Sequence, residues 1–262
     1  MHLQHSMACS LLGLAVAVSQ GCSFAPEARA GGTSPVGDAR QLVLVTTARW
    51  EASAGTLRRY ERSALSNEWQ EVGEPFAVVV GRSGLGWGIG RHDVEIKDGP
   101  TKEEGDGRAP AGAFGLSAAF GYAAHSDVDY IKLPYVTSTD QYLCIDDPAS
   151  EHYNRLVNTQ RVPADWNSRE RMLRDDHLYS LGVVVDHNWA DQTQPGKGSC
   201  IFLHVWRGPG QPTVGCTAMD EGNLRTLLGW LDPRQTPTLV QLPEGTYRSL
   251  QRKWPLPEID AR

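Results

Sequence analysis

Short runs of apolar and β-branched residues, separated by glycine, proline and aspartate, recur along the chain from Gln41 onward. Two of them, residues 57–61 and 69–72, are separated by a short polar segment and predict a hairpin. Strands at this spacing, with turn residues between them, predict one mostly β domain of the α+β class with an antiparallel or mixed sheet. The predicted strands are residues 41–47, 57–61, 69–72, 76–80, 142–145, 179–186, 200–206 and 238–242.

One helix is expected in the second half of the chain. Asp220 is a good N-cap residue, and Pro233 ends the pattern. Between them four leucines follow the spacing of a buried helical stripe, at Leu224, Leu227, Leu228 and Leu231.

The two ends of the chain lack the pattern of short apolar runs that recurs in the middle. Residues 1–30 hold a short apolar stretch followed by Ala28-Arg29-Ala30, which predicts an export leader. Cleavage after Ala30 would release the protein, whereas lipidation of Cys22 would anchor it to a membrane, and both remain open. Residues 31–40 are expected to form a flexible linker, residues 41–245 one domain, and residues 246–262 a loosely held tail. The protein is therefore expected in the periplasm or cell envelope.

Composition narrows the classes of partner. The net charge is −6 and arginine and lysine occur only in short groups such as Arg58-Arg59. A nucleic-acid-binding protein normally presents a basic face, so nucleic acid is not expected as a partner. Nothing in the sequence indicates the oligomeric state.

Five cysteines are present, of which Cys144, Cys200 and Cys216 follow the leader. In an oxidising compartment an odd number implies one disulfide and one free thiol. If Cys144 and Cys200 pair, Cys216 is left free. No C-x-x-C or clustered histidine spacing indicates a metal site.

Cys216 and His204 are the candidate nucleophile and base. His204 lies on a predicted strand, and Cys216 follows Gly215 a few residues before the predicted helix. A helix N-terminus stabilises an anion, so the pattern predicts a thiolate, and the Cys216 N–H is a candidate for half of an oxyanion hole. Gly215 would let the backbone approach a substrate closely. The alternative is a buried structural cysteine and a strand histidine bonded to a carbonyl group.

Two motifs give this arrangement a family resemblance. Ile201-Phe-Leu-His204 with Gly215-Cys216-Thr-Ala-Met219 resembles the signature of L,D-transpeptidase catalytic domains, and residues 104–114 look like that family's Thr-Pro-x-Gly-x-Phe hairpin, with Ala109 in place of threonine. The resemblance implies a β-sandwich-like catalytic domain, no cofactor, and peptidoglycan stem peptides as partners. It also implies transfer of a stem tetrapeptide through a cysteine thioester, with loss of the terminal D-alanine.

The chain departs from the family pattern around the nucleophile. Thr213-Val214 stands where Ser-His is usual, and Ala218 stands where an arginine is usual. Arg207, in the loop between His204 and Cys216, is the candidate replacement for that charge, because a guanidinium binds a carboxylate with two parallel hydrogen bonds. Trp206 and Thr213 are the other expected substrate-binding residues.

Three functions remain open from the sequence. The first is a peptidoglycan L,D-transpeptidase for wall cross-linking or remodelling. The second is a hydrolase that passes the same thioester to water, as an L,D-carboxypeptidase or amidase. The third is a wall-binding domain without catalysis, which would predict a damaged Cys–His pair. The glycine-rich residues 84–90 are interpreted as a mobile loop bordering the site, and His187 as a residue near its cleft.

Overall fold

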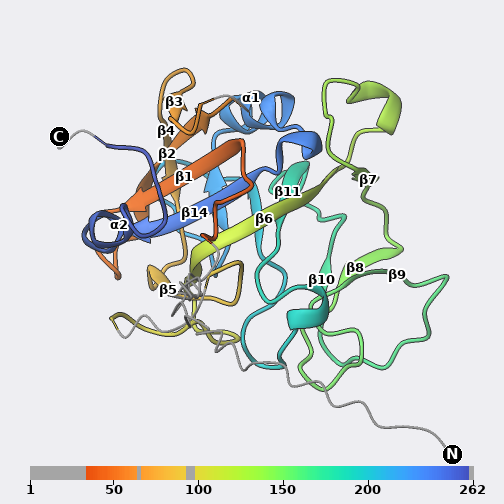
Figure 1. Ribbon diagram of the computed structural model, residues 1–262. Coiled ribbons are helices and arrows are strands. Elements are labelled where there is room, and N and C mark those ends of the chain that lie inside the picture. The colour runs from red at the N-terminus through yellow and green to blue at the C-terminus, as the bar shows by residue number, and fades with distance from the viewer. Residues whose placement is uncertain (1–33, 64–65, 93–97, 260–262) are drawn as a thin grey trace, which may run out of the picture. The chain divides into compact units, whose positions relative to one another are not determined.

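The computed structural model describes residues 34–63, 66–92 and 98–259, and β-structure predominates in them (Figure 1). Strands account for 32% of these described residues and helices for 12%, which confirms the expectation of a mostly β protein. The predicted leader and Cys22 lie outside the described residues. Within the described residues, no helix combines the length and the apolar character needed to span a bilayer.

The strands follow in chain order. They are β1 (Gln41–Thr47), β2 (Ala54–Glu61), β3 (Gln70–Glu71), β4 (Phe76–Val79), β5 (Leu85–Trp87), β6 (Ala109–Gly121), β7 (Tyr135–Thr137), β8 (Tyr142–Cys144), β9 (Leu156–Asn158), β10 (Glu170–Arg171), β11 (Leu181–Val185), β12 (Phe202–Val205), β13 (Thr217–Met219) and β14 (Thr238–Pro243). The helices are α1 (Glu221–Trp230) and α2 (Glu244–Leu250), with short 3-10 turns at His125–Asp127, Ala190–Gln192 and Pro233–Gln235.

The main sheet closes on itself. Its strands run in the order β1-β14-β6-β11-β12-β13-β4-β2, and β2 pairs with β1 again. All seven residues of β1 are buried, and the strand has a neighbour on each edge, β14 in parallel and β2 antiparallel. The hydrogen-bonded strand order follows a closed, barrel-like path, and the sandwich-like catalytic domain that the family resemblance implies stays a prediction.

Strand β6 crosses much of the sheet and was not among the predicted strands. It is rich in alanine and glycine, residues that are depleted in strands, so its sequence carries little β signal. The small side chains let other groups approach closely. Gly112 has a φ of +137°, and a Cβ atom there would lie 2.0 Å from the His92 ring.

The predicted helix is confirmed as α1. The Asp220 carboxylate accepts a hydrogen bond from the Gly222 N–H at 2.9 Å and caps the helix. Leu224, Leu227 and Leu228 are buried, and the helix contacts β11 and β12. Burial of this leucine stripe therefore supports the strand that carries His204.

Both ends of the described chain are packed, contrary to the expected linker and tail. Val36 and Ala39 are fully buried, and the Arg62 side chain donates to the carbonyl groups of Val36, Gly37 and Ala39. These hydrogen bonds hold residues 36–39 against the domain, so this segment is not a flexible linker.

At the other end, Tyr247 on α2 is buried, and Trp254 and Leu256 belong to the same hydrophobic core. Apolar side chains that leave water here outweigh the polar character that suggested a loose tail over residues 246–262.

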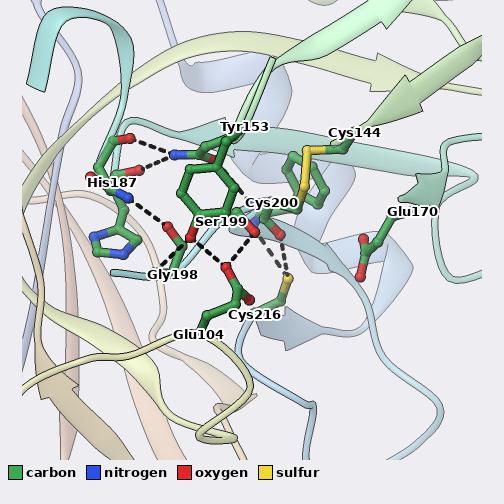
Figure 2. The surroundings of a disulfide bond; sticks show 12 residues. Glu104, Cys144, Tyr153, Glu170, His187, Gly198, Ser199, Cys200 and Cys216 are labelled. Atoms are coloured by element: carbon green, nitrogen blue, oxygen red, sulfur yellow. Dashed lines mark hydrogen bonds between the residues drawn. A yellow bond between two sulfur atoms is a disulfide. The ribbon is translucent and has the colours of Figure 1, made fainter. Parts of the chain in front are cut away.

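A second, three-stranded sheet joins β10, β8 and β9. A disulfide between Cys144 on β8 and Cys200 links this sheet to the segment that enters β12, and it confirms the candidate pair (Figure 2). Glu170 on β10 lies opposite Cys144 in the strand register. The disulfide therefore ties Glu170 to the neighbourhood of His204.

Candidate active site

The nucleophile and base candidates come together because β12 and β13 are parallel neighbours. His204 on β12 is in register with Ala218 on β13, and Cys216 lies one residue before β13 begins. The eleven residues between His204 and Cys216 form the crossover that parallel strands require. The Cys216 thiol accepts from the Phe202 N–H at 3.4 Å and donates to the Cys200 carbonyl at 3.5 Å (Figure 2).

Thr213 holds the turn that presents Cys216. Its hydroxyl donates to the Cys216 carbonyl at 2.6 Å and accepts from the Gly215 N–H at 3.1 Å. Its backbone N–H donates to the Val80 carbonyl at 3.0 Å. Thr213, predicted as a substrate-binding residue, therefore fixes the backbone at the candidate nucleophile. Gly215 is buried in this turn, and a Cβ there would lie 3.3 Å from the Arg108 carbonyl, which is a tight fit.

One cavity of about 130 Å³ brings most of the predicted site together. The predicted residues that line it are His204, Trp206, Arg207, Thr213 and Cys216. The sequence did not assign the others: Glu170, Arg174, Leu178, Tyr179, Gln211, Pro212, Val214 and Ala218.

A second cavity of about 210 Å³ reaches the same cysteine from another side. Gly215, the sixth predicted site residue, lines this second cavity and not the first. Charged side chains contribute much of its wall, namely Arg82, Lys102, Glu104, Asp146 and Glu170. Glu170, Val214 and Cys216 line both cavities, so Cys216 lies at the wall that the two cavities share.

His204 is arranged to accept a proton at one ring nitrogen. Its Nδ1 lies 2.8 Å from the Val205 carbonyl, and because a carbonyl only accepts, Nδ1 carries the hydrogen. The lone pair is then on Nε2. Burial lowers the pKa of His204 to about 4, so the imidazole is neutral near pH 7 and able to act as a base.

The Cys216 thiol is neutral rather than a preformed thiolate, which corrects the expectation from the helix. Burial is the largest cause that raises its pKa to about 12, and the Glu170 charge adds to it. The Phe202 N–H, the Lys102 charge and the Tyr179 hydroxyl act in the opposite direction without overcoming burial. The helix exerts little influence because β13 and the Asp220 cap separate Cys216 from the first residue of α1.

Two arginines line the first cavity. Arg174 makes a two-pronged ion pair with Asp176, with both hydrogen bonds at 2.9 Å, and lies over the Tyr179 ring at 5.0 Å. Hydrogen bonds from Arg174, with a smaller contribution from the Arg207 charge, lower the pKa of Asp176 to about 2. Arg207 is exposed at the cavity. Its position suits the predicted role of binding an anionic group.

The residues that sequence reasoning missed come from one polar segment. Glu170 and Arg174 lie in a stretch with neither a motif nor a periodic pattern, and Tyr179 begins the predicted strand 179–186 without a signal that marks it as a site residue. Tyr179 packs edge-on against the His204 ring, with centroids 5.2 Å apart, and its hydroxyl donates to Glu170 at 2.6 Å. The pairing of β10 with β8 and the disulfide bring Glu170 to the cysteine, whereas Tyr179 reaches His204 because it lies two residues before β11, which pairs with β12.

Two features that the sequence placed beside the site lie elsewhere in the structure. Residues 84–90 contain β5, which pairs with β6, and none of them lines either of the two cavities. His187 lines neither cavity, since it is buried between the Ile89 N–H at 3.2 Å and the Lys197 carbonyl at 3.0 Å. Both contribute to the core of the domain.

Comparisons of this chain with protein-family models, with curated proteins and with solved structures found no match.

Proposed function

We propose that this chain is a peptidoglycan L,D-transpeptidase, a cysteine acyltransferase that passes stem tetrapeptides through a thioester. The observation that carries the proposal is that Cys216 and His204 line one cavity. Cys216 is the one free cysteine among the described residues, and the His204 Nε2 lone pair is available to take its proton. We also propose that the domain has the fold of an L,D-transpeptidase catalytic domain.

The first half-reaction forms the thioester. His204 Nε2 takes the Cys216 proton as the sulfur attacks the carbonyl carbon of the L-centre in the donor tetrapeptide. The C–N bond to D-alanine then breaks, and the imidazolium gives its proton to the leaving amine. Because the thiol is neutral at rest, proton removal accompanies the attack instead of preceding it.

The first cavity suits the leaving end of the donor. D-alanine ends in a carboxylate, and Arg207 and Arg174 place positive charge in the cavity that also holds His204. Arg207 is the better candidate for direct contact, because Arg174 is already paired with Asp176. Arg207 thus takes the role of the arginine that Ala218 replaces.

The proposed location is the periplasm or cell envelope. The Cys144–Cys200 disulfide is compatible with an oxidising compartment, where peptidoglycan also lies. The export leader and the anchoring of Cys22 remain predictions.

Mass spectrometry of the purified mature protein with tetrapeptide muropeptides tests the proposal. Cross-linked dimers that require Cys216 are expected, along with a thioester adduct on that residue. Cys216→Ser is the matched variant, because it changes one atom and leaves the turn intact. Tripeptide without dimers would indicate the hydrolase, and the absence of both product and adduct would refute the acyltransferase.

A further inference from the structure

Glu170 occupies the junction of the two cavities. Together with Val214 it shares both linings with Cys216, and it is the one titratable side chain other than Cys216 that does so. His204 lines the first cavity only, and Glu104 and Asp146 line the second only. A molecule that reaches the sulfur through the second cavity therefore meets a carboxylate at Glu170.

The position of Glu170 is fixed on two sides. Its backbone lies opposite Cys144 in the strand register. Cys144 is disulfide-bonded to Cys200, and the Cys200 carbonyl accepts a hydrogen bond from the Cys216 thiol. On the side-chain side its carboxylate accepts the Tyr179 hydroxyl at 2.6 Å. A carboxylate held at both its backbone and its side chain is suited to proton transfer in a set geometry.

We propose that Glu170 is the base of the second half-reaction, taking a proton from the acceptor that enters through the second cavity. The inference rests on the proposed acyltransferase function and assigns a catalytic residue to it. The acceptor is a primary amine or water, and its lone pair attacks the carbonyl carbon of the Cys216 thioester.

Atoms and charges balance in this step. A C–N bond, or a C–O bond with water, forms as the C–S bond breaks and sulfur leaves as a thiolate. The proton of the attacking group passes to the Glu170 carboxylate. Because Glu170 and Cys216 line the same two cavities, the protonated Glu170 then gives its proton to the leaving sulfur, while Tyr179 holds the carboxyl group by its hydrogen bond. Enzyme thiol and carboxylate are both regenerated.

The positions of His204 and Glu170 assign them to different half-reactions. His204 serves the donor cavity and protonates the leaving amine, whereas Glu170 serves the side from which the acceptor arrives. Burial raises the pKa of Glu170, which brings its proton affinity closer to that needed by a base near neutral pH. The ionisable groups that act on it are Tyr179, Asp146, Arg174, Glu104 and Cys216.

The test separates the two half-reactions by rapid mixing and intact-protein mass spectrometry with a tetrapeptide donor. In Glu170→Gln, which keeps the size of the side chain, the thioester should form within about threefold of the wild-type rate. Its breakdown should slow by roughly 10²-fold or more, the usual contribution of a general base. Wild-type breakdown should rise with pH as Glu170 ionises, and the variant should lose that rise.

Two further variants control the test. Glu151→Gln changes an exposed carboxylate that lines neither cavity and should leave both rates unchanged. Tyr179→Phe keeps the ring against His204 and removes the hydroxyl, so it should slow breakdown less than Glu170→Gln does.

Unchanged thioester breakdown in Glu170→Gln would overturn the inference. So would an equal loss in both half-reactions, which is the result expected of a merely structural carboxylate. A wild-type protein that never forms a thioester would instead refute the proposed acyltransferase itself, so the two failures are distinguishable.

Discussion

A pH titration of thiol reactivity directly tests the protonation state of Cys216, the candidate nucleophile. Cys216 has a pKa of about 12 in the folded protein because its thiol is buried beside Glu170. In the unfolded chain the same residue should titrate near the ordinary value for cysteine, about 8.5. Folding therefore moves the midpoint of reactivity by about 3.5 pH units toward alkaline pH.

The size of the effect near pH 7 follows from two opposing factors. A shift of about 3.5 units lowers the thiolate fraction by about 3000-fold. The more basic thiolate is also the better nucleophile, and a Brønsted coefficient of about 0.45 returns about 40-fold. Native Cys216 should therefore react with a small disulfide roughly 10²-fold more slowly than the unfolded chain, before any further slowing from limited access.

Dithiodipyridine is a suitable probe, because the thiopyridone that it releases is followed by absorbance. The native protein and the same protein unfolded in urea are compared over a range of pH without reductant, so that the Cys144–Cys200 disulfide stays closed. Cys216→Ala should abolish the signal. A native profile that levels off at or below pH 8.5, or a native rate at pH 7 equal to that of the unfolded chain, would show a preformed thiolate and refute the reasoning.

Four further outcomes are expected. Replacing Cys144 and Cys200 by alanine opens a loop with a sequence separation of 56 and should lower the free energy of unfolding by about 4 kcal/mol in urea titrations; an unchanged midpoint would mean that other contacts hold the segment. Trp254→Ala should cost about 3–5 kcal/mol, because the indole is buried in the core, and a loss under about 1 kcal/mol would contradict that packing. His204 has a folded pKa of about 4, below its unfolded value of about 6.5, so its neutral form is favoured by folding and stability falls as pH drops through this window. At pH 5 this amounts to about 2 kcal/mol, which His204→Gln should remove from the difference between pH 7 and pH 5. Arg207→Ala should raise KM for a donor with a free terminal carboxylate and leave an amidated donor little affected; an equal effect on both would exclude the carboxylate contact.

Local patterns in the sequence predicted many of the strands and helix α1. Strands such as β1 and β14 are runs of β-branched and other apolar residues, whose preference for extended structure agrees with their burial. Helix α1 combines a cap, a leucine stripe and a proline within fourteen residues, so each of its signals is local. Strand β6 escaped prediction because alanine and glycine carry no such preference, and only its neighbours on both sides make it a strand.

The candidate site likewise combines residues that the sequence indicates with residues that only the fold brings together. The sequence by itself determined the nucleophile and base candidates and the loop with Arg207, because His204, Gly215 and Cys216 lie within one short stretch of chain. Only the tertiary structure brought Glu170 and Tyr179 to the site: Glu170 through the register of β10 with β8 and the disulfide between distant cysteines, and Tyr179 through the pairing of β11 with β12. It also decided that the thiol is neutral, because ionisation depends on burial and neighbouring charge, and both are properties of the assembled core rather than of the residues next to Cys216 in sequence.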